Sequence, residues 1–186
     1  MIRAGIPTLP LLAFLLPAFA QEVQLSRAGL VYSVEGEVRL DDRPVNRAPG
    51  RYTFVPESSV LRAELGKAVV LLTNGAVLHI APNSSMRLVD NRLSQPHVEL
   101  PAGTFKLECS NPVRQREVSL SFLDALVLIQ TEGEYHFEAS RRMITVIEGE
   151  AHIRFAGQSV VVRSGQTLAL RDRSQVESVR PVRVEF

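Results

Sequence analysis

The stretch "AVVLLTNGAVLHI", residues 68–80, sets the fold class of this 186-residue chain. Two apolar runs flank the dipeptide Asn74-Gly75, and both residues of that pair tolerate the positive φ that a type I′ hairpin turn requires. Short apolar runs on either side of such a turn are typical of paired β-strands. The stretch therefore predicts an antiparallel hairpin with a type I′ turn.

Period-two alternation extends outward from this hairpin. In "HVELPAGTFKLEC" (97–109), apolar residues alternate with polar ones on both sides of a Pro-Ala-Gly break, as they do in half-buried strands. Turn-forming residues recur so often that the chain has room for roughly fifteen short strands. The sequence predicts an all-β fold, either a β-helix or solenoid-like body or a jelly-roll-like sandwich. The positions expected to form structural turns are Gly36, Asn74, Gly75, Gly103, Gly133, Gly149 and Gly165.

Two segments have an alternative interpretation as short helices. "SSVLRAELGK" (58–67) offers a serine cap and Gly66 as a stop, and "SFLDALVLIQ" (121–130) places Asp124 either on a helix face or at a turn. Periodicity alone does not assign apolar runs this short. Because strand patterns flank both segments, we expect strands and turns.

Residues 1–20 have the pattern of a secretory signal peptide. Arg3 precedes an apolar run that closes with Ala18-Phe19-Ala20, so cleavage is expected before Gln21. An uncleaved anchor is the alternative, but the run is shorter than the roughly 20 residues of a membrane-spanning helix, and prolines interrupt it. Gln21 stands where a lipoprotein would carry cysteine. We expect residues 21–186 to form one all-β domain, periplasmic or secreted, with no membrane span after cleavage.

Charge and cysteine content exclude some classes. Without Arg3, the chain has 20 basic and 20 acidic residues, whereas a nucleic-acid-binding protein would show a basic excess. Cys109 is the only cysteine, so no internal disulfide can form. We expect this thiol to be buried, because free cysteine usually behaves as a small hydrophobic residue. Intermolecular pairing is the alternative.

Two near-identical stretches, "VEGEVRL" (34–40) and "IEGEAHI" (147–153), each place glutamates around a glycine. Paired carboxylates about 5 to 10 Å apart would suit glycoside cleavage, although this chain has no tryptophan to form a sugar platform. The favoured interpretation is structural: each glycine allows a tight bend, and the glutamates face solvent. We expect the two stretches to occupy equivalent places in the fold.

Histidines give the remaining case for an enzyme. His136 and Glu138 are two apart on a predicted strand and so share a face, and His152 on a later strand could join them. A metal site normally needs three protein ligands, and no His-x-His is present. His79 and His97 are expected to be half-buried strand residues. The serines lie in turn contexts without a Gly-x-Ser-x-Gly elbow, so we expect no catalytic residues, no metal and no cofactor.

From residue 29 to residue 170 the chain resembles the FecR domain. The resemblance rests on the motifs "GLVYSVEGEVRL", "LGKAVVLLTNGAVLHIAPNSSMRLVDNRL", "VELPAGTFKLE" and "TEGEYHFEASRRMITVIEGEAHIRFAGQSVVVRSGQTLAL". It implies an exported all-β module of the kind found in regulators of iron-uptake signalling and in stand-alone envelope proteins. The chain departs from the family at "PESSVLRAEL", where members commonly carry a Gly-Asp turn and a Thr-Gly step. It also shows no cytoplasmic segment to hold a sigma factor, so the regulatory role is not expected.

The function expected from these observations is that of a non-enzymatic, exported binding module of the bacterial cell envelope, which contacts an envelope protein in signalling or assembly. The alternative is a module that binds polysaccharide or cell wall through an exposed patch built from Tyr32, Tyr52 or Tyr135. A metal-dependent enzyme is the third hypothesis. The sequence names no binding residue and no particular partner.

Overall fold

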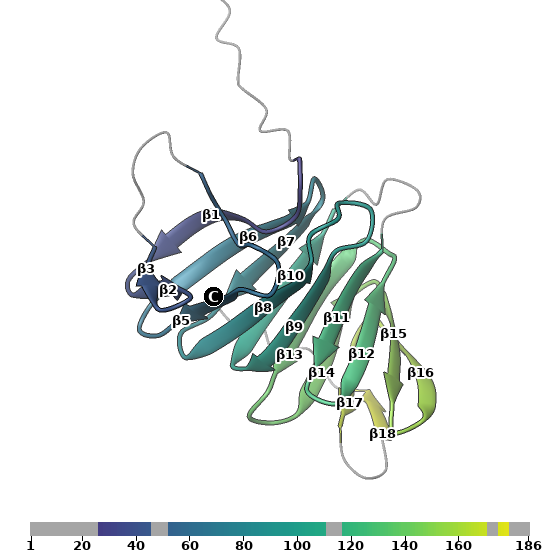
Figure 1. The fold of residues 1–186 in the computed structure, drawn as a ribbon. Coiled ribbons are helices and arrows are strands. Elements are labelled where there is room, and N and C mark those ends of the chain that lie inside the picture. The colour runs from purple at the N-terminus through teal and green to yellow at the C-terminus, as the bar shows by residue number, and fades with distance from the viewer. Residues whose placement is uncertain (1–25, 46–51, 111–116, 171–174, 179–186) are drawn as a thin grey trace, which may run out of the picture.

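The computed structural model describes residues 26–45, 52–110, 117–170 and 175–178. Every regular element in these ranges is a β-strand, so the all-β prediction is confirmed. The strands form two nine-stranded sheets, which are stacked as two layers (Figure 1). We call them sheet A and sheet B.

Apart from the edge strands β4 and β3, which lie outside β1 and β2, both sheets follow the chain order from one end of the molecule to the other. Sheet A has the spatial order β18 (Gln175–Ser178), β17 (Gln166–Ala169), β14 (Met143–Glu148), β13 (Gly133–Glu138), β10 (Thr104–Cys109), β7 (Ala76–Ile80), β6 (Lys67–Thr73), β1 (Leu30–Glu35) and β4 (Thr53–Phe54). Sheet B has the order β16 (Gln158–Arg163), β15 (Glu150–Phe155), β12 (Ala125–Ile129), β11 (Val118–Phe122), β9 (His97–Ala102), β8 (Ser84–Asp90), β5 (Val60–Ala63), β2 (Val38–Leu40) and β3 (Arg43–Pro44).

The chain adds to the two sheets alternately. Hairpins β6–β7, β13–β14 and β17–β18 lie in sheet A, and hairpins β8–β9, β11–β12 and β15–β16 lie in sheet B. All strand pairs are antiparallel except β9 with β11, which are parallel because the intervening strand β10 belongs to the other sheet. The two stacked sheets form a sandwich that does not close into a barrel.

The core lies between the sheets and follows from the alternation in the sequence. In β7, β11 and β12 every second side chain is buried and the others are half-buried, because successive side chains of a strand point to opposite faces. Large aromatic residues join the layers: the rings of Phe122 in sheet B and Phe137 in sheet A meet edge to face, with centroids 5.4 Å apart. Such pairs are worth about 0.5–1.5 kcal/mol beyond the area that they bury.

The two Glu-Gly-Glu stretches have equivalent places, as expected. Gly36 follows the end of β1 and Gly149 follows the end of β14, and at both points the chain crosses from sheet A to sheet B. Their φ angles are 70° and 95°, in the left-handed region that favours glycine. The stretches are therefore crossing points between the layers.

Neighbouring crossings pack backbone against backbone. A Cβ atom on Gly36 would lie 2.9 Å from the carbonyl oxygen of Leu65, and one on Gly149 would lie 2.3 Å from that of Glu132. Leu65 and Glu132 belong to crossings in the opposite direction, so the chain leaves and enters a sheet at adjacent points. Three other predicted turn residues lie at crossings from sheet B to sheet A: Gly103, Gly133 and Gly165.

The hairpin at Asn74-Gly75 forms between β6 and β7, but its turn is not type I′. Neither residue has a positive φ, so this detail of the prediction is wrong. The pairing register shifts between Leu71 and Thr73, and a bulge of this kind adds local twist to the strand. A type I′ turn matches the twist of regular hairpin strands. We therefore attribute the different turn found here to the added local twist.

Both segments with a helical alternative are strands. Val60–Ala63 forms β5, and the second segment gives β11 and β12, with the turn at Leu123 and Asp124 between them. Leu123 has a φ of 51° at this turn. Within the ranges described, no helix has the length and apolar character that crossing a membrane requires. The predicted signal peptide, residues 1–20, lies outside those ranges.

Candidate functional site

Among the residues that the structure describes, β16 is the longest of the four edge strands. At the opposite end, β3 and β4 have two residues each, and β3 contains Pro44, which cannot donate to a neighbouring strand. At the end of the molecule where β16 lies, the edge strand of sheet A is β18, which has four residues. Strand β16 has six, with the sequence QSVVVR. Natural edge strands usually carry lysine, proline or a bulge that blocks pairing with another chain. Residues 158–162 of β16 have none of these.

The backbone of β16 presents hydrogen-bonding groups to the side away from β15. The amide of Ser164 donates to the carbonyl of Gly149, whereas the amide of Arg163 points the other way and donates to Oε1 of Gln166, at 2.8 Å. Amide direction alternates along a strand, so Ser159 and Val161 direct their N–H and C=O groups outward with Arg163. Only the Arg163 amide is capped by a side chain of its own molecule among the described residues.

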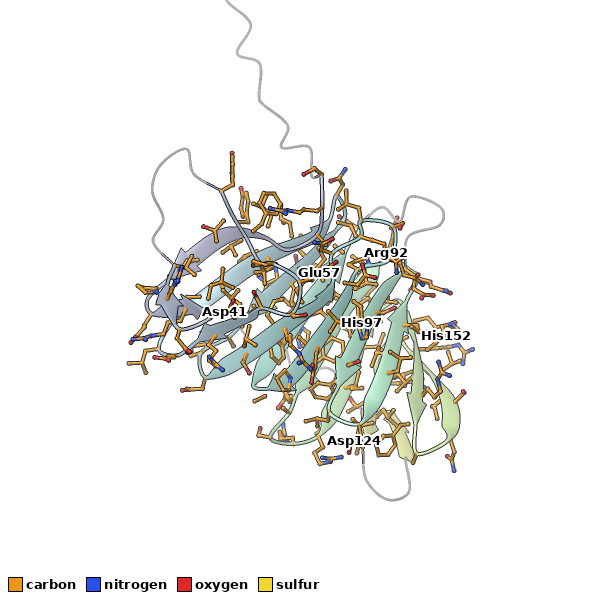
Figure 2. All side chains as sticks on the ribbon, in the orientation of Figure 1. Asp41, Glu57, Arg92, His97, Asp124 and His152 are labelled. Carbon is orange, nitrogen blue, oxygen red and sulfur yellow. The ribbon has the colours of Figure 1, made fainter. Side chains whose placement is uncertain are left out.

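A hollow of about 260 Å³ lies beside this edge on the outer face of sheet B. Half-buried Leu126 and Leu128 of β12 and Val161 of β16 supply its apolar surface. Ser159, opposite Arg154 in the register, is exposed and small, and it separates the hollow from the edge. The remaining lining residues are His152, Ile153, Arg154 and Val160. Figure 2 shows His152 on the outer side of β15.

The charges around the hollow are predominantly basic. Glu150 pairs with Arg163 in the register of β15 and β16, and its carboxylate lies 3.1 Å from Nε of Arg163 and 3.1 Å from Nε2 of His152. Arg154 is exposed, and no ion pair of its side chain occurs among the residues that the structure describes. Arg154, Arg163 and Glu150 of β15 and β16 together carry a net positive charge, which a negatively charged ligand group would complement.

The histidine cluster considered in the sequence does not assemble. His136 lies on β13 in sheet A and His152 on β15 in sheet B, so the two imidazoles belong to different layers. His136 is 4% exposed, and its Nε2 lies 2.7 Å from Oε1 of Glu134. Glu138 lies 3.5 Å from Arg141. In the described part of the chain, no three His, Cys, Asp or Glu residues are grouped to hold a metal ion.

The other two histidines are half-buried strand residues, as predicted. Nε2 of His97 lies 2.8 Å from Oγ of Ser121 on the outer face of sheet B. His79 lines a smaller hollow, of about 120 Å³, with Ser33 and Lys67 on the outer face of sheet A. Its Nε2 lies 3.4 Å from Oε2 of Glu108, but the angle is not that of a hydrogen bond, so we treat the contact as electrostatic only.

The three tyrosines separate into one buried and two exposed residues. Tyr135 is fully buried in the core, and its hydroxyl group lies 2.8 Å from Oγ1 of Thr131, so it is not part of a surface patch and that part of the prediction is wrong. Tyr32 is 54% exposed and Tyr52 is 62% exposed. They are neighbours by register, because Val31 pairs with Thr53.

Cys109 is half-buried and packs against the core from the end of β10. Burial raises the pKa of the Cys109 thiol to about 12, so the thiolate that would act as a nucleophile is disfavoured. The predicted burial is therefore confirmed in large part.

The residues around β16 were missed by sequence reasoning. The segment "QSVVVR" lies within the closing motif of the resemblance to the FecR domain, and its lack of lysine and proline is visible in the sequence. Its position at an edge is not visible, because that depends on which strand pairs with which. In each of the two Glu-Gly-Glu stretches, the glutamate after the glycine forms an ion pair: Glu37 binds Arg39 at 3.0 Å, and Glu150 binds Arg163.

Comparison with known proteins identifies no family. No family model matches the chain, and no curated protein matches it. The chain is similar to two crystal structures of a protein from Parabacteroides distasonis that is described as a "putative anti-sigma factor". The structure at 2.50 Å resolution shares 12% identity with the chain and the one at 1.65 Å shares 11%, and the TM-score is 0.48 for both. Each match covers 56% of this chain and 51% of that one, so the likeness spans about half of each protein. It carries no inference about function, and the resemblance to the FecR domain stays a prediction.

Proposed function

We propose that this protein is a non-enzymatic, exported protein-binding module of the bacterial cell envelope, and that it binds its partner by accepting an extended strand at the β16 edge. The carrying observation is the six-residue edge strand, free of proline and lysine over residues 158–162, beside an apolar hollow. Strand addition of this kind takes affinity from main-chain hydrogen bonds and specificity from side-chain pockets. The signal-peptide pattern of residues 1–20 supports the export part of the proposal.

Proline substitution tests the edge directly. Val161→Pro removes an outward-facing N–H, and proline is tolerated on an edge strand at such a position, so the pairing of β16 with β15 is kept. Val161→Thr retains the N–H and most of the side-chain shape, and serves as the matched control. A photo-crosslinking amino acid at exposed Gln158 reports contact at the edge, and one at Leu65, which is 79% exposed and distant along the sheet order, reports unspecific contact.

The expected result is a crosslinked envelope protein with the probe at position 158, absent with the probe at position 65. The crosslink should persist in Val161→Thr and fall at least tenfold in Val161→Pro, while the circular dichroism of the three proteins stays the same. Equal crosslinking in Val161→Pro would refute strand addition at this edge. Capture of only a second copy of the chain would replace the envelope partner with self-association.

A second candidate function rests on Tyr32 and Tyr52. Two exposed aromatic side chains in neighbouring register positions form a surface on which a sugar ring can stack, in a module that binds polysaccharide or cell wall. Binding to a glycan array that disappears in the double variant Tyr32→Ala and Tyr52→Ala, but not in Val161→Pro, would favour this function over the first.

A further inference from the structure

The structure also indicates which kind of strand the β16 edge accepts. We propose that the bound segment is antiparallel to β16 and carries an acidic residue opposite Arg163, a small or β-branched residue opposite Val161 and a large apolar residue opposite Ser159. In the direction of the bound chain this gives an acidic residue followed, four positions later, by leucine, methionine or phenylalanine. This inference rests on the proposed function.

The spacing follows from strand geometry. Successive residues opposite Arg163, Val161 and Ser159 are two apart in the bound strand, and their side chains lie on the outer face with the hollow. Ser159 and Val161 each offer one N–H and one C=O, so these two residues can contribute about four hydrogen bonds to the ladder. The amide of Arg163 is already bound to Gln166, and position 163 therefore contributes through its side chain.

The apolar position follows from the shape of the surface beside Ser159. Neighbouring strands are roughly 4.8 Å apart, so a large side chain opposite Ser159 must pass over that residue to reach the hollow. Ser159 is small enough to permit this, and the side chain then contacts Val161 and approaches Leu126. The methylene groups of Arg154 also line the hollow and can cover part of the bound side chain.

The acidic position follows from the basic charge of the edge. The side chain of Arg163 is 66% exposed, and the Glu150 carboxylate that it contacts is shared with His152. A carboxylate of the bound strand opposite Arg163 would complement this excess charge. If a second copy of β16 paired in this register instead, its Ser159 would lie opposite Arg163, and serine supplies no negative charge. The edge is therefore suited better to another protein than to itself.

Synthetic peptides test the pattern on the purified protein. The reference peptide is acetyl-TTETVTLTT-amide, which presents Glu, Val and Leu at alternating positions. Its reversed counterpart, acetyl-TTLTVTETT-amide, has the same composition and opposite order. Binding is measured by the change in amide chemical shifts of the protein as each peptide is added. The expected result is shift changes at residues 159–161 and an affinity at least fivefold higher for the reference peptide than for the reversed one.

Protein variants identify which side chains read the peptide. Replacing the peptide glutamate with glutamine should weaken binding to the wild-type protein about two- to fivefold, as for an exposed ion pair, and should have no effect on binding to Arg163→Gln. Replacing the peptide leucine with alanine should weaken binding to the wild-type protein at least fivefold, and should have little effect on Ser159→Gln, in which the path to the hollow is filled.

Each outcome decides between the two proposals. Equal binding of the reference and reversed peptides, or no binding of either, overturns the acidic–apolar pattern. If crosslinking of the cellular partner still depends on Val161 in that case, the edge binds a strand of different chemistry and only the pattern is refuted. If crosslinking is indifferent to Val161→Pro, strand addition itself is refuted.

Discussion

At the scale of single residues, Gly149 shows how tightly the crossings between the sheets are packed. Its φ is 95°, and a Cβ atom would lie 2.3 Å from the carbonyl oxygen of Glu132 and 2.4 Å from the hydroxyl oxygen of Tyr135. Neither of these atoms can move freely, because one is backbone and the other belongs to a fully buried side chain. The position therefore requires glycine for space as well as for conformation.

We expect Gly149→Ala to lower the free energy of unfolding by more than about 3 kcal/mol, since steric overlap adds to the cost of a positive φ. Gly157→Ala is the matched control: its φ is 76°, but no atom lies within 4 Å of the added Cβ. It should cost only about 1–2 kcal/mol. Urea denaturation of both variants measures the difference, and equal costs would show that the crossing relaxes around a methyl group.

Tyr135→Phe isolates the hydrogen bonds of the one buried tyrosine. The hydroxyl oxygen lies 2.8 Å from Oγ1 of Thr131 and donates to the carbonyl of Thr131 at 3.1 Å. Losing these bonds in a buried site should lower the free energy of unfolding by about 1–2 kcal/mol. Tyr32→Phe, at an exposed position, should leave it unchanged. If both variants denature at the same urea concentration as the wild type, the hydroxyl group contributes nothing.

At the scale of elements, the outer face of sheet A carries an ion-pair network that spans β7 and β10. Nζ of Lys106 lies 2.6 Å from Oε1 of Glu108, and this hydrogen bond is the main reason why the pKa of Glu108 is held below its ordinary value. A carboxyl group with a lowered pKa in the folded state stabilises the protein above its unfolded pKa, about 4.3. That stabilisation is lost as the pH falls through the lowered value.

Glu108→Gln should therefore be less stable than the wild type at pH 7, by less than about 1 kcal/mol because the pair is partly exposed. The difference should shrink as the pH falls below about 4.3 and through the lowered pKa of Glu108, because the residue then becomes protonated in both states. Thermal unfolding of the two proteins at a series of pH values measures this. A difference that persists unchanged at pH 2 would mean that glutamine disturbs the sheet for another reason.

Element types were predictable from the sequence, whereas several local details were not. Alternation in residues 118–129 predicts β11 and β12 because half-buried strands need one apolar face. The turn type at Asn74-Gly75 was missed because it depends on a bulge two residues earlier, between Leu71 and Thr73. The burial of Tyr135 was missed as well, since alternation gives two faces for a strand but does not say which one packs against the other sheet.

The candidate site could not be predicted for a related reason. Leu126, Leu128, Ser159 and Val161 come from strands whose neighbours are fixed only when both sheets are assembled. The same assembly places His136 and His152 in different sheets, although the strand faces predicted from the sequence were compatible with a shared site. Which strands become neighbours in one sheet is a property of the whole topology, and short alternating segments carry little information about it.

At the scale of the whole molecule, Cys109 reports on the integrity of the sandwich. Its thiol is packed against the core, and burial raises its pKa to about 12. At pH 8 the folded protein should react with a disulfide reagent at least tenfold more slowly than the protein in urea, because the thiolate is the reacting form. The rate should rise with urea in parallel with the loss of circular dichroism. Rapid, stoichiometric labelling without denaturant would show that the end of β10 opens independently.

Alternate addition of strands to two sheets has a consequence for the history of such chains. A barrel fixes its strand number by closure, but these sheets end freely, and each pair of hairpins contacts mainly the pair before it. Duplication or deletion of a four-strand segment such as β13–β16 would leave the earlier registers intact. Proteins of this architecture can thus lengthen or shorten by whole segments. Deletion of β13–β16 would make β12 the terminal strand of sheet B and change the binding specificity of that edge, whereas duplication would keep the β16 sequence there.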